Sequence, residues 1–166
     1  MKAIFLSFLL LAFGAFTGRS QGTALTSQHQ KTMLEYAGPQ TNTLVPIALL
    51  NKDGQIAAEA AKWLSGVRRQ PLATYSFSPG SPVFVGTAAQ RADSLFAAAE
   101  TAAQTIYFID CDALFGKPAP TPEEKLMQER ILMLAKKYRG ATLFQCGAQP
   151  AYLALARARF GIVSLD

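Results

Sequence analysis

Short apolar runs alternate with amphipathic segments along most of the chain. Between the runs, apolar side chains recur at the three- and four-residue spacing of helices in residues 56–67, 88–103, 122–139 and 150–160. Runs rich in β-branched, aromatic and aliphatic residues, typical of strands, occupy residues 44–50, 72–77, 83–85, 106–109, 141–146 and 162–165. Strands that alternate with helices indicate a parallel sheet with crossover connections. The pattern predicts an α/β fold: a three-layer, Rossmann-like domain with a mostly parallel sheet of about five strands.

Two of the expected helices begin with a capping-box pattern. Thr121 is followed by Pro122 and, three residues after the threonine, by Glu124. Thr87 and Gln90 have the same spacing. In this motif the threonine hydroxyl accepts a hydrogen bond from the third helical residue, whose side chain accepts one from the threonine amide. We expect both helices to begin at these residues.

The first twenty residues have the features of an export signal. One positive charge, Lys2, precedes an uncharged stretch that ends at Gly18, and small residues stand at Gly18 and Ser20. The stretch is shorter than the roughly 20 apolar residues of a membrane-spanning helix. We interpret residues 1–20 as a signal peptide that is cleaved near Ser20, so that the protein is periplasmic or extracellular. An uncleaved membrane anchor is the alternative.

A polar lead-in, residues 21–43, follows this signal and precedes a single α/β domain, residues 44–166. We expect the lead-in to be mobile or to form a short packing arm. The only histidine of the chain, His29, lies in it without an acidic or cysteine neighbour. We therefore interpret His29 as an exposed loop residue.

Composition excludes several classes of protein. The chain has 166 residues, one histidine and two cysteines, which excludes a four-thiolate zinc ribbon and any metal site that needs two imidazoles. Loss of Lys2 and Arg19 would lower the net charge from +5 to +3, and aromatic residues do not interleave with the basic ones. Nucleic-acid binding is therefore not expected. Glycine-rich nucleotide motifs, HExxH and GxSxG are absent from the sequence. We expect no metal, no cofactor and no membrane segment once the signal is removed.

The chemistry-bearing residues follow the expected strands. In an open parallel sheet, ligands bind beyond the carboxyl ends of the strands. We expect a binding site at this edge that uses Thr87, Asp110, Asp112 and Gly147. The two aspartates could ligate Mg²⁺ or serve as acid and base, or they could be turn-forming side chains that bond their own backbone.

Both cysteines, Cys111 and Cys146, fall at the same edge. Cys146 precedes a helix, whose positive amino end lowers the pKa of a nearby thiol, and Gly147 allows close approach of a ligand. Cys146 is thus the candidate catalytic nucleophile. If the two strands are neighbours, Cys111 and Cys146 could instead form a disulfide, and a third possibility is a buried, inert thiol.

Residues 83–166 resemble the DsrE-type sulfur-relay fold. The resemblance lies in the order of elements and in the strand Thr142-Leu143-Phe144-Gln145-Cys146, which ends in a cysteine. In some members of that family a cysteine at this place carries persulfide sulfur. The resemblance therefore implies a role for Cys146 in sulfur transfer.

Two functions remain open at this point. The first is a non-catalytic domain that binds a protein or small-molecule partner at the carboxyl edge of the sheet. The second is a sulfur carrier or thiol oxidoreductase centred on Cys146. We favour the first, because the sequence supplies no complete set of catalytic residues.

Overall fold

A computed structural model describes residues 24–41, 44–51, 54–81, 87–147 and 149–165. Their strands form one sheet in which every pair is parallel, in the order β2-β3-β4-β1-β5. The strands are β1 (Ile47–Leu50), β2 (Leu72–Ser76), β3 (Thr105–Ile109), β4 (Thr142–Cys146) and β5 (Gly161–Ser164). The predicted α/β fold with a five-strand parallel sheet is confirmed. The strand expected at residues 83–85 lies outside the described residues.

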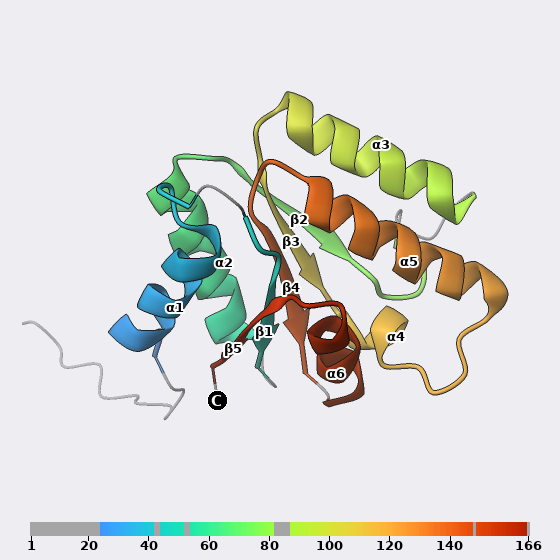
Figure 1. Cartoon of the computed structure of the whole chain (residues 1–166). Helices are drawn as coiled ribbons and strands as arrows, with labels where there is room; N and C mark the ends of the chain where they lie inside the picture. Colours follow the sequence, from blue (N-terminus) through green and yellow to red (C-terminus); the bar gives the residue numbers. More distant parts are fainter. Residues whose placement is uncertain (1–23, 42–43, 52–53, 82–86, 148, 166) are drawn as a thin grey trace, which may run out of the picture.

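Helices cover both faces of the sheet (Figure 1). One face carries α1 (Ser27–Ala37) and α2 (Gln55–Arg68). The other face carries α3 (Ala88–Thr101), α4 (Asp112–Phe115), α5 (Pro122–Lys137) and α6 (Gln149–Arg157). The connection through α2 crosses the sheet in one direction, from β1 to β2, and the later connections cross it in the other. Because crossovers share one hand, opposite directions place the helices on opposite faces.

Two hydrophobic clusters fill the spaces between the layers. On the α3–α6 side, Phe108 stacks on Phe77 and on Phe144, each with ring centroids 4.9 Å apart. On the α1–α2 side, Leu143 and Tyr107 belong to the second cluster. Successive residues of β3 and β4 thus face opposite clusters, as alternation along a strand requires.

The polar segment before the domain contains α1. Thr26 caps this helix in a capping box with His29, and Met33 and Ala37 are fully buried against the sheet and α2. His29 therefore lies in the first turn of a helix, and the expectation of a loop histidine is wrong. Its position follows from the exchange of hydrogen bonds with Thr26, whose hydroxyl accepts from the His29 amide at 3.3 Å.

The two predicted capping boxes differ. Thr121 accepts from the amide of Glu124 at 3.2 Å, and the Glu124 carboxylate accepts from the Thr121 amide at 2.8 Å, so this box is confirmed. At α3, Thr87 makes no side-chain bond to the helix backbone and its hydroxyl instead bonds the Gln90 side chain. The second box is therefore wrong, because the two side chains satisfy each other.

Candidate functional site

The residues that follow β3 and β4 lie together at the carboxyl edge of the sheet. The Cys111 amide donates to the Gln145 carbonyl at 3.2 Å, and the Gly147 amide donates to Oδ2 of Asp112 at 2.8 Å. Thr87 is exposed at the start of α3, with its side chain on Gln90. The described contacts thus join the groups after β3 to those after β4, whereas the side-chain bond given for Thr87 stays within its own helix.

Asp110 ties the ends of β2 and β3 to each other. Its Oδ2 accepts hydrogen bonds from the hydroxyls of Ser76 at 2.6 Å and Ser78 at 2.7 Å. Its backbone has φ 57°, in the left-handed region, and its amide donates to Oε1 of Gln145 at 3.4 Å. Asp110 and Asp112 thus accept hydrogen bonds from residues that are distant in the sequence, and these bonds join neighbouring strand ends. They are not the local backbone bonds of the turn-forming role considered for the two aspartates.

Both cysteines are free and fully buried. Sγ of Cys111 lies 3.6 Å from the Phe108 carbonyl, and Sγ of Cys146 lies 3.9 Å from the Phe144 carbonyl. The disulfide considered from the sequence is not formed in this structure. Burial, and after it the neighbouring Cys146, raises the pKa of the Cys111 thiol well above its ordinary value. Because the thiolate is the nucleophile, a thiol kept protonated in a closed core is poorly suited to attack a substrate.

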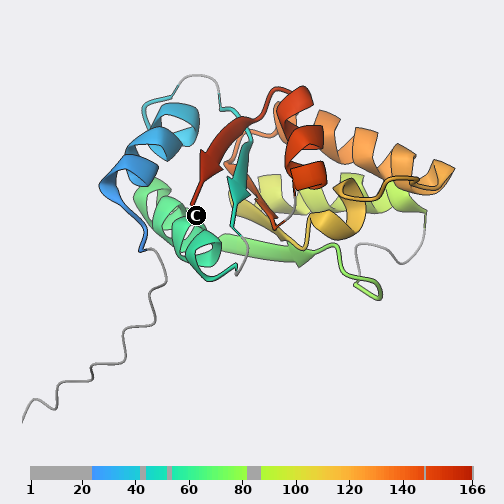
Figure 2. The same ribbon diagram turned by 90° about the horizontal axis from the view of Figure 1, so that it is seen from below.

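A crevice is expected where β1 and β4 lie side by side. After β1 the chain passes to α2 on one face, and after β4 it passes to α6 on the other, as Figure 2 shows from below. Ligands of open α/β sheets bind at such switch points. Asn51 ends β1 here: its amide donates to the Cys146 carbonyl at 2.9 Å, and its side chain is 2% exposed. Among the described residues, Oδ1 of Asn51 has no hydrogen-bond partner.

A groove of about 420 Å³ runs from this switch point along α2. One wall is α2, with Gln55, Ala58 and Lys62. The floor is the surface of β2 and β3, formed by Leu72, Thr74, Tyr107 and Ile109. The groove exists because α2 crosses the sheet obliquely and, with α1, is the only described helix on this face.

Gln145 closes the end of the groove at the switch point. Its side chain accepts from the Asp110 amide and packs against Gly54, which has φ 75°. A Cβ at Gly54 would lie 3.3 Å from Nε2 of Gln145. Glycine at this position therefore permits both the left-handed turn into α2 and the close approach of the Gln145 amide.

Tyr107 is the unusual residue of the groove. It is 3% exposed and lines the groove, yet no described residue forms a hydrogen bond with its hydroxyl. Burial raises the pKa of the phenol above its ordinary value, and Cys111 and Asp110 raise it further. The hydroxyl is not one of the fully enclosed atoms without a partner, so it is open to the groove. The sequence did not single out Tyr107, because it lies within an apolar run and resembles the other positions of a buried strand.

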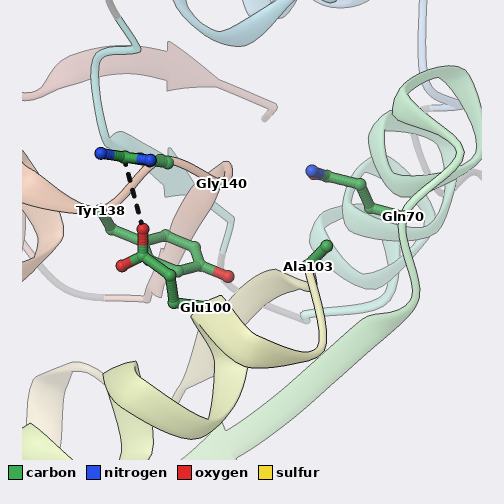
Figure 3. Close-up of a pocket in the computed structure, with 6 residues that line it drawn as sticks. Gln70, Glu100, Ala103, Tyr138 and Gly140 are labelled. Atoms are coloured by element: carbon green, nitrogen blue, oxygen red, sulfur yellow. Dashed lines mark ion pairs between the residues drawn. The ribbon is translucent and has the colours of Figure 1, made fainter.

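A second pocket, of about 260 Å³, lies at the opposite edge of the sheet (Figure 3). Tyr138 and Glu100 stand on one side, and Gln70 and Ala103 on the other. Its polar groups serve the fold: the Tyr138 hydroxyl donates to the Gln104 carbonyl at 2.6 Å, and Oε1 of Gln70 accepts from Thr105 at 3.2 Å. This edge carries the amino ends of the strands, and we regard its pocket as a junction between elements.

The chain matches no protein-family model and is not similar to any curated protein sequence. Within the described ranges, no three histidine, cysteine or acidic side chains are grouped closely enough to hold a metal ion. The same part of the chain holds no helix with the length and apolar character to cross a bilayer.

Proposed function

We propose that this protein is a non-catalytic binding domain that holds a small molecule in the groove between α2 and the β2–β3 surface. The observation that carries the proposal is the Tyr107 hydroxyl: Tyr107 lines the groove, and no described residue forms a hydrogen bond with its hydroxyl. The hydroxyl is not one of the fully enclosed unpartnered atoms, so it is open to the groove. A hydrogen bond contributes about 0.5–1.5 kcal/mol net, and a ligand that accepts one from Tyr107 would gain this contribution.

The composition of the groove supports this role. Its floor is largely apolar, and the polar groups are few and converge from α2, β3 and β4. Small-molecule sites combine these two features, because apolar contact supplies affinity and a few polar groups fix orientation. The groove also opens at the switch point, where parallel sheets bind their ligands.

The test is a screen of neutral and charged aromatic fragments against the protein, followed by amide chemical shifts. We expect shifts to cluster at Gly54–Lys62, Leu72–Thr74 and Tyr107–Ile109. Ala58→Leu should reduce binding at least tenfold, because leucine fills the groove while preserving helix propensity. Shifts clustered at Tyr138 and Gly140 instead, or binding unchanged by Ala58→Leu, would overturn the proposal.

We also propose that the domain acts outside the cytoplasm. The support is the uncharged stretch after Lys2 with small residues at Gly18 and Ser20. Amino-terminal sequencing of protein recovered from the native host should give a chain that starts near residue 21. Recovery of the intact chain from the cytosol would refute export without touching the binding proposal.

The resemblance to DsrE-type proteins supports a second candidate, a sulfur carrier on Cys146. The contact between Cys146 and Cys111 is the observation in its favour, and the complete burial of both thiols is the observation against it. Iodoacetamide separates the two functions. We expect no alkylation of the folded protein at pH 8 and alkylation of both cysteines in urea. Rapid, selective alkylation of Cys146 in the folded protein would favour the carrier.

A further inference from the structure

Several polar side chains that line the groove can donate hydrogen bonds, while those of Gln55 and Thr74 can both donate and accept. Besides the Tyr107 hydroxyl, Nε2 of Gln145 faces Gly54 while Oε1 of Gln145 is already engaged by the Asp110 amide. Lys62 is exposed on α2 and forms no ion pair with any described residue. No acidic side chain is among the described residues that line the groove. A ligand that satisfies these donors presents acceptors, and a negative charge on it would complement Lys62.

Lys62 and Gln145 stand at opposite ends of the groove, and Tyr107 is the middle residue of β3. Gln55 and Lys62 are seven residues apart, which separates them by about 10 Å along the axis of α2. Because α2 runs back against the parallel strands, its amino end and Gln145 lie at the carboxyl edge, and Lys62 lies toward the amino edge. The remaining surface of the groove is largely apolar, with Ala58, Leu72 and Ile109, and it also carries the hydroxyl of the exposed Thr74.

We propose that the groove binds an elongated small organic acid, with the anionic group at Lys62, an apolar body over β2 and β3, and a neutral acceptor at Tyr107 and Gln145. This inference rests on the proposed function and adds the class of ligand. The charged contact gives the ligand its orientation, because among the described lining residues the cation, Lys62, lies at one end of the groove. The apolar contact and the Tyr107 hydroxyl then distinguish this ligand from small inorganic anions.

Titration with 4-phenylbutyrate and with its uncharged amide, 4-phenylbutyramide, tests the charge. The readout is the amide shift at Lys62, Thr74 and Tyr107. We expect the acid to bind at least about tenfold more tightly than the amide, a difference that a single charge-assisted contact can supply. In Lys62→Gln the difference should vanish. It should persist in Lys125→Gln, a matched control because Lys125 is an exposed lysine on α5.

A second pair of ligands tests the acceptor. An acetyl group at the para position of 4-phenylbutyrate adds a carbonyl at the end away from the acid. We expect the acetylated acid to bind more tightly than 4-phenylbutyrate to the wild type, and equally to Tyr107→Phe. This variant should fold, because it removes only a hydroxyl that has no described partner.

The outcomes separate this inference from the proposed function. Equal binding of acid and amide, or a preference for the acid that survives Lys62→Gln, overturns the organic acid and leaves the groove as a binding site. Binding of neutral fragments to the groove without binding of the acid would also overturn the organic acid and leave the groove as a binding site. If no compound from either series shifts the groove amides, both proposals fail.

Discussion

At the scale of single residues, Asp110 combines an unfavourable backbone with a dense set of hydrogen bonds. Its φ of 57° is tolerated by aspartate and asparagine better than by most residues. Its carboxylate holds the hydroxyls of Ser76 and Ser78, and thereby the turn that follows β2. Because the strained backbone and the hydrogen bonds both belong to Asp110, substitutions at this residue can separate their contributions to stability.

Asp110→Ala should lower the free energy of unfolding by about 2–4 kcal/mol, because it removes both charge-assisted bonds and leaves the left-handed backbone on a residue that disfavours it. Asp110→Asn keeps an acceptor oxygen and the backbone preference, and should cost about half as much or less. Urea unfolding followed by Trp63, the only tryptophan, measures both values. Equal losses in the two variants would show that neither property matters here.

Thr142 presents the opposite case, a buried hydroxyl that contributes nothing. It is 2% exposed at the start of β4, and its Oγ1 has no hydrogen-bond partner within the described ranges. Thr142→Val should therefore raise the free energy of unfolding by about 1 kcal/mol, since valine has the same shape and no unpaired hydroxyl.

Thr105 is the matched control for this substitution. It is a fully buried threonine at the start of the neighbouring strand, and its hydroxyl donates to Gln70. Thr105→Val should destabilise the protein by about 1 kcal/mol, because it leaves Gln70 with one donor fewer. A loss of stability in Thr142→Val, measured by the same urea titration, would mean that its hydroxyl has a partner.

Single residues also show what the sequence could predict of the candidate site. The meeting of Asp112 with Gly147, and of Cys111 with Cys146, follows from strand ends that share one edge, and this part was predictable. The state of the thiols was not, because burial depends on the helices packed over them. Tyr107 was also beyond prediction, since the missing partner of its hydroxyl depends on the path of α2 across the sheet.

At the scale of elements, two sequence patterns with the same capping-box spacing gave different helix starts. Thr121 and Glu124 exchange both bonds of a capping box, and Lys117 also binds the Glu124 carboxylate. The Lys117 ammonium, which hydrogen-bonds that carboxylate, holds the pKa of Glu124 below its ordinary value. At α3 the partner is Gln90, and a neutral amide is held less firmly by the helix amino end than a carboxylate is.

The two threonines therefore should differ in their contribution to stability. Thr121→Ala should lower the free energy of unfolding by about 1 kcal/mol, the usual effect of losing an N-cap side chain. Thr87→Ala should change it by less than about 0.5 kcal/mol, because the Thr87 hydroxyl is bonded, among the described residues, to the exposed Gln90 side chain. Urea unfolding of the two variants measures both losses. A larger loss in Thr121→Ala than in Thr87→Ala would show that the capping bond, rather than the presence of a threonine, stabilises the helix start. Equal losses would contradict the assignment at α3.

At the scale of the whole molecule, the alternation of strands and helices was enough to predict the parallel sheet, but not how completely its faces are covered. That coverage depends on residues 21–43, whose polar character indicated a lead-in. In the structure their helix α1 contacts β5, β1 and α2 and buries Met33. Arg68, at the end of α2, donates to the carbonyls of Ala37 at 2.8 Å and Gly38 at 3.1 Å and joins the two helices. A few apolar residues at helical spacing are enough to anchor a helix on a sheet. An interpretation from composition alone underestimates their contribution.

If α1 is part of the core, a cavity beneath it must weaken the whole domain. Met33→Ala should lower the free energy of unfolding by about 2–4 kcal/mol, the usual cost of a large-to-small change at a fully buried site. The urea transitions followed by Trp63 fluorescence and by far-UV circular dichroism should remain coincident, since Met33 and Trp63 belong to the same cluster. Lys31→Ala, on the exposed side of the same helix, should change the free energy by less than about 0.5 kcal/mol. An unchanged midpoint of the urea transition in Met33→Ala would instead show that residues 24–41 are an arm that contributes nothing to the stability of the fold. The face of the sheet beside the groove would then be more open than the packing of α1 implies.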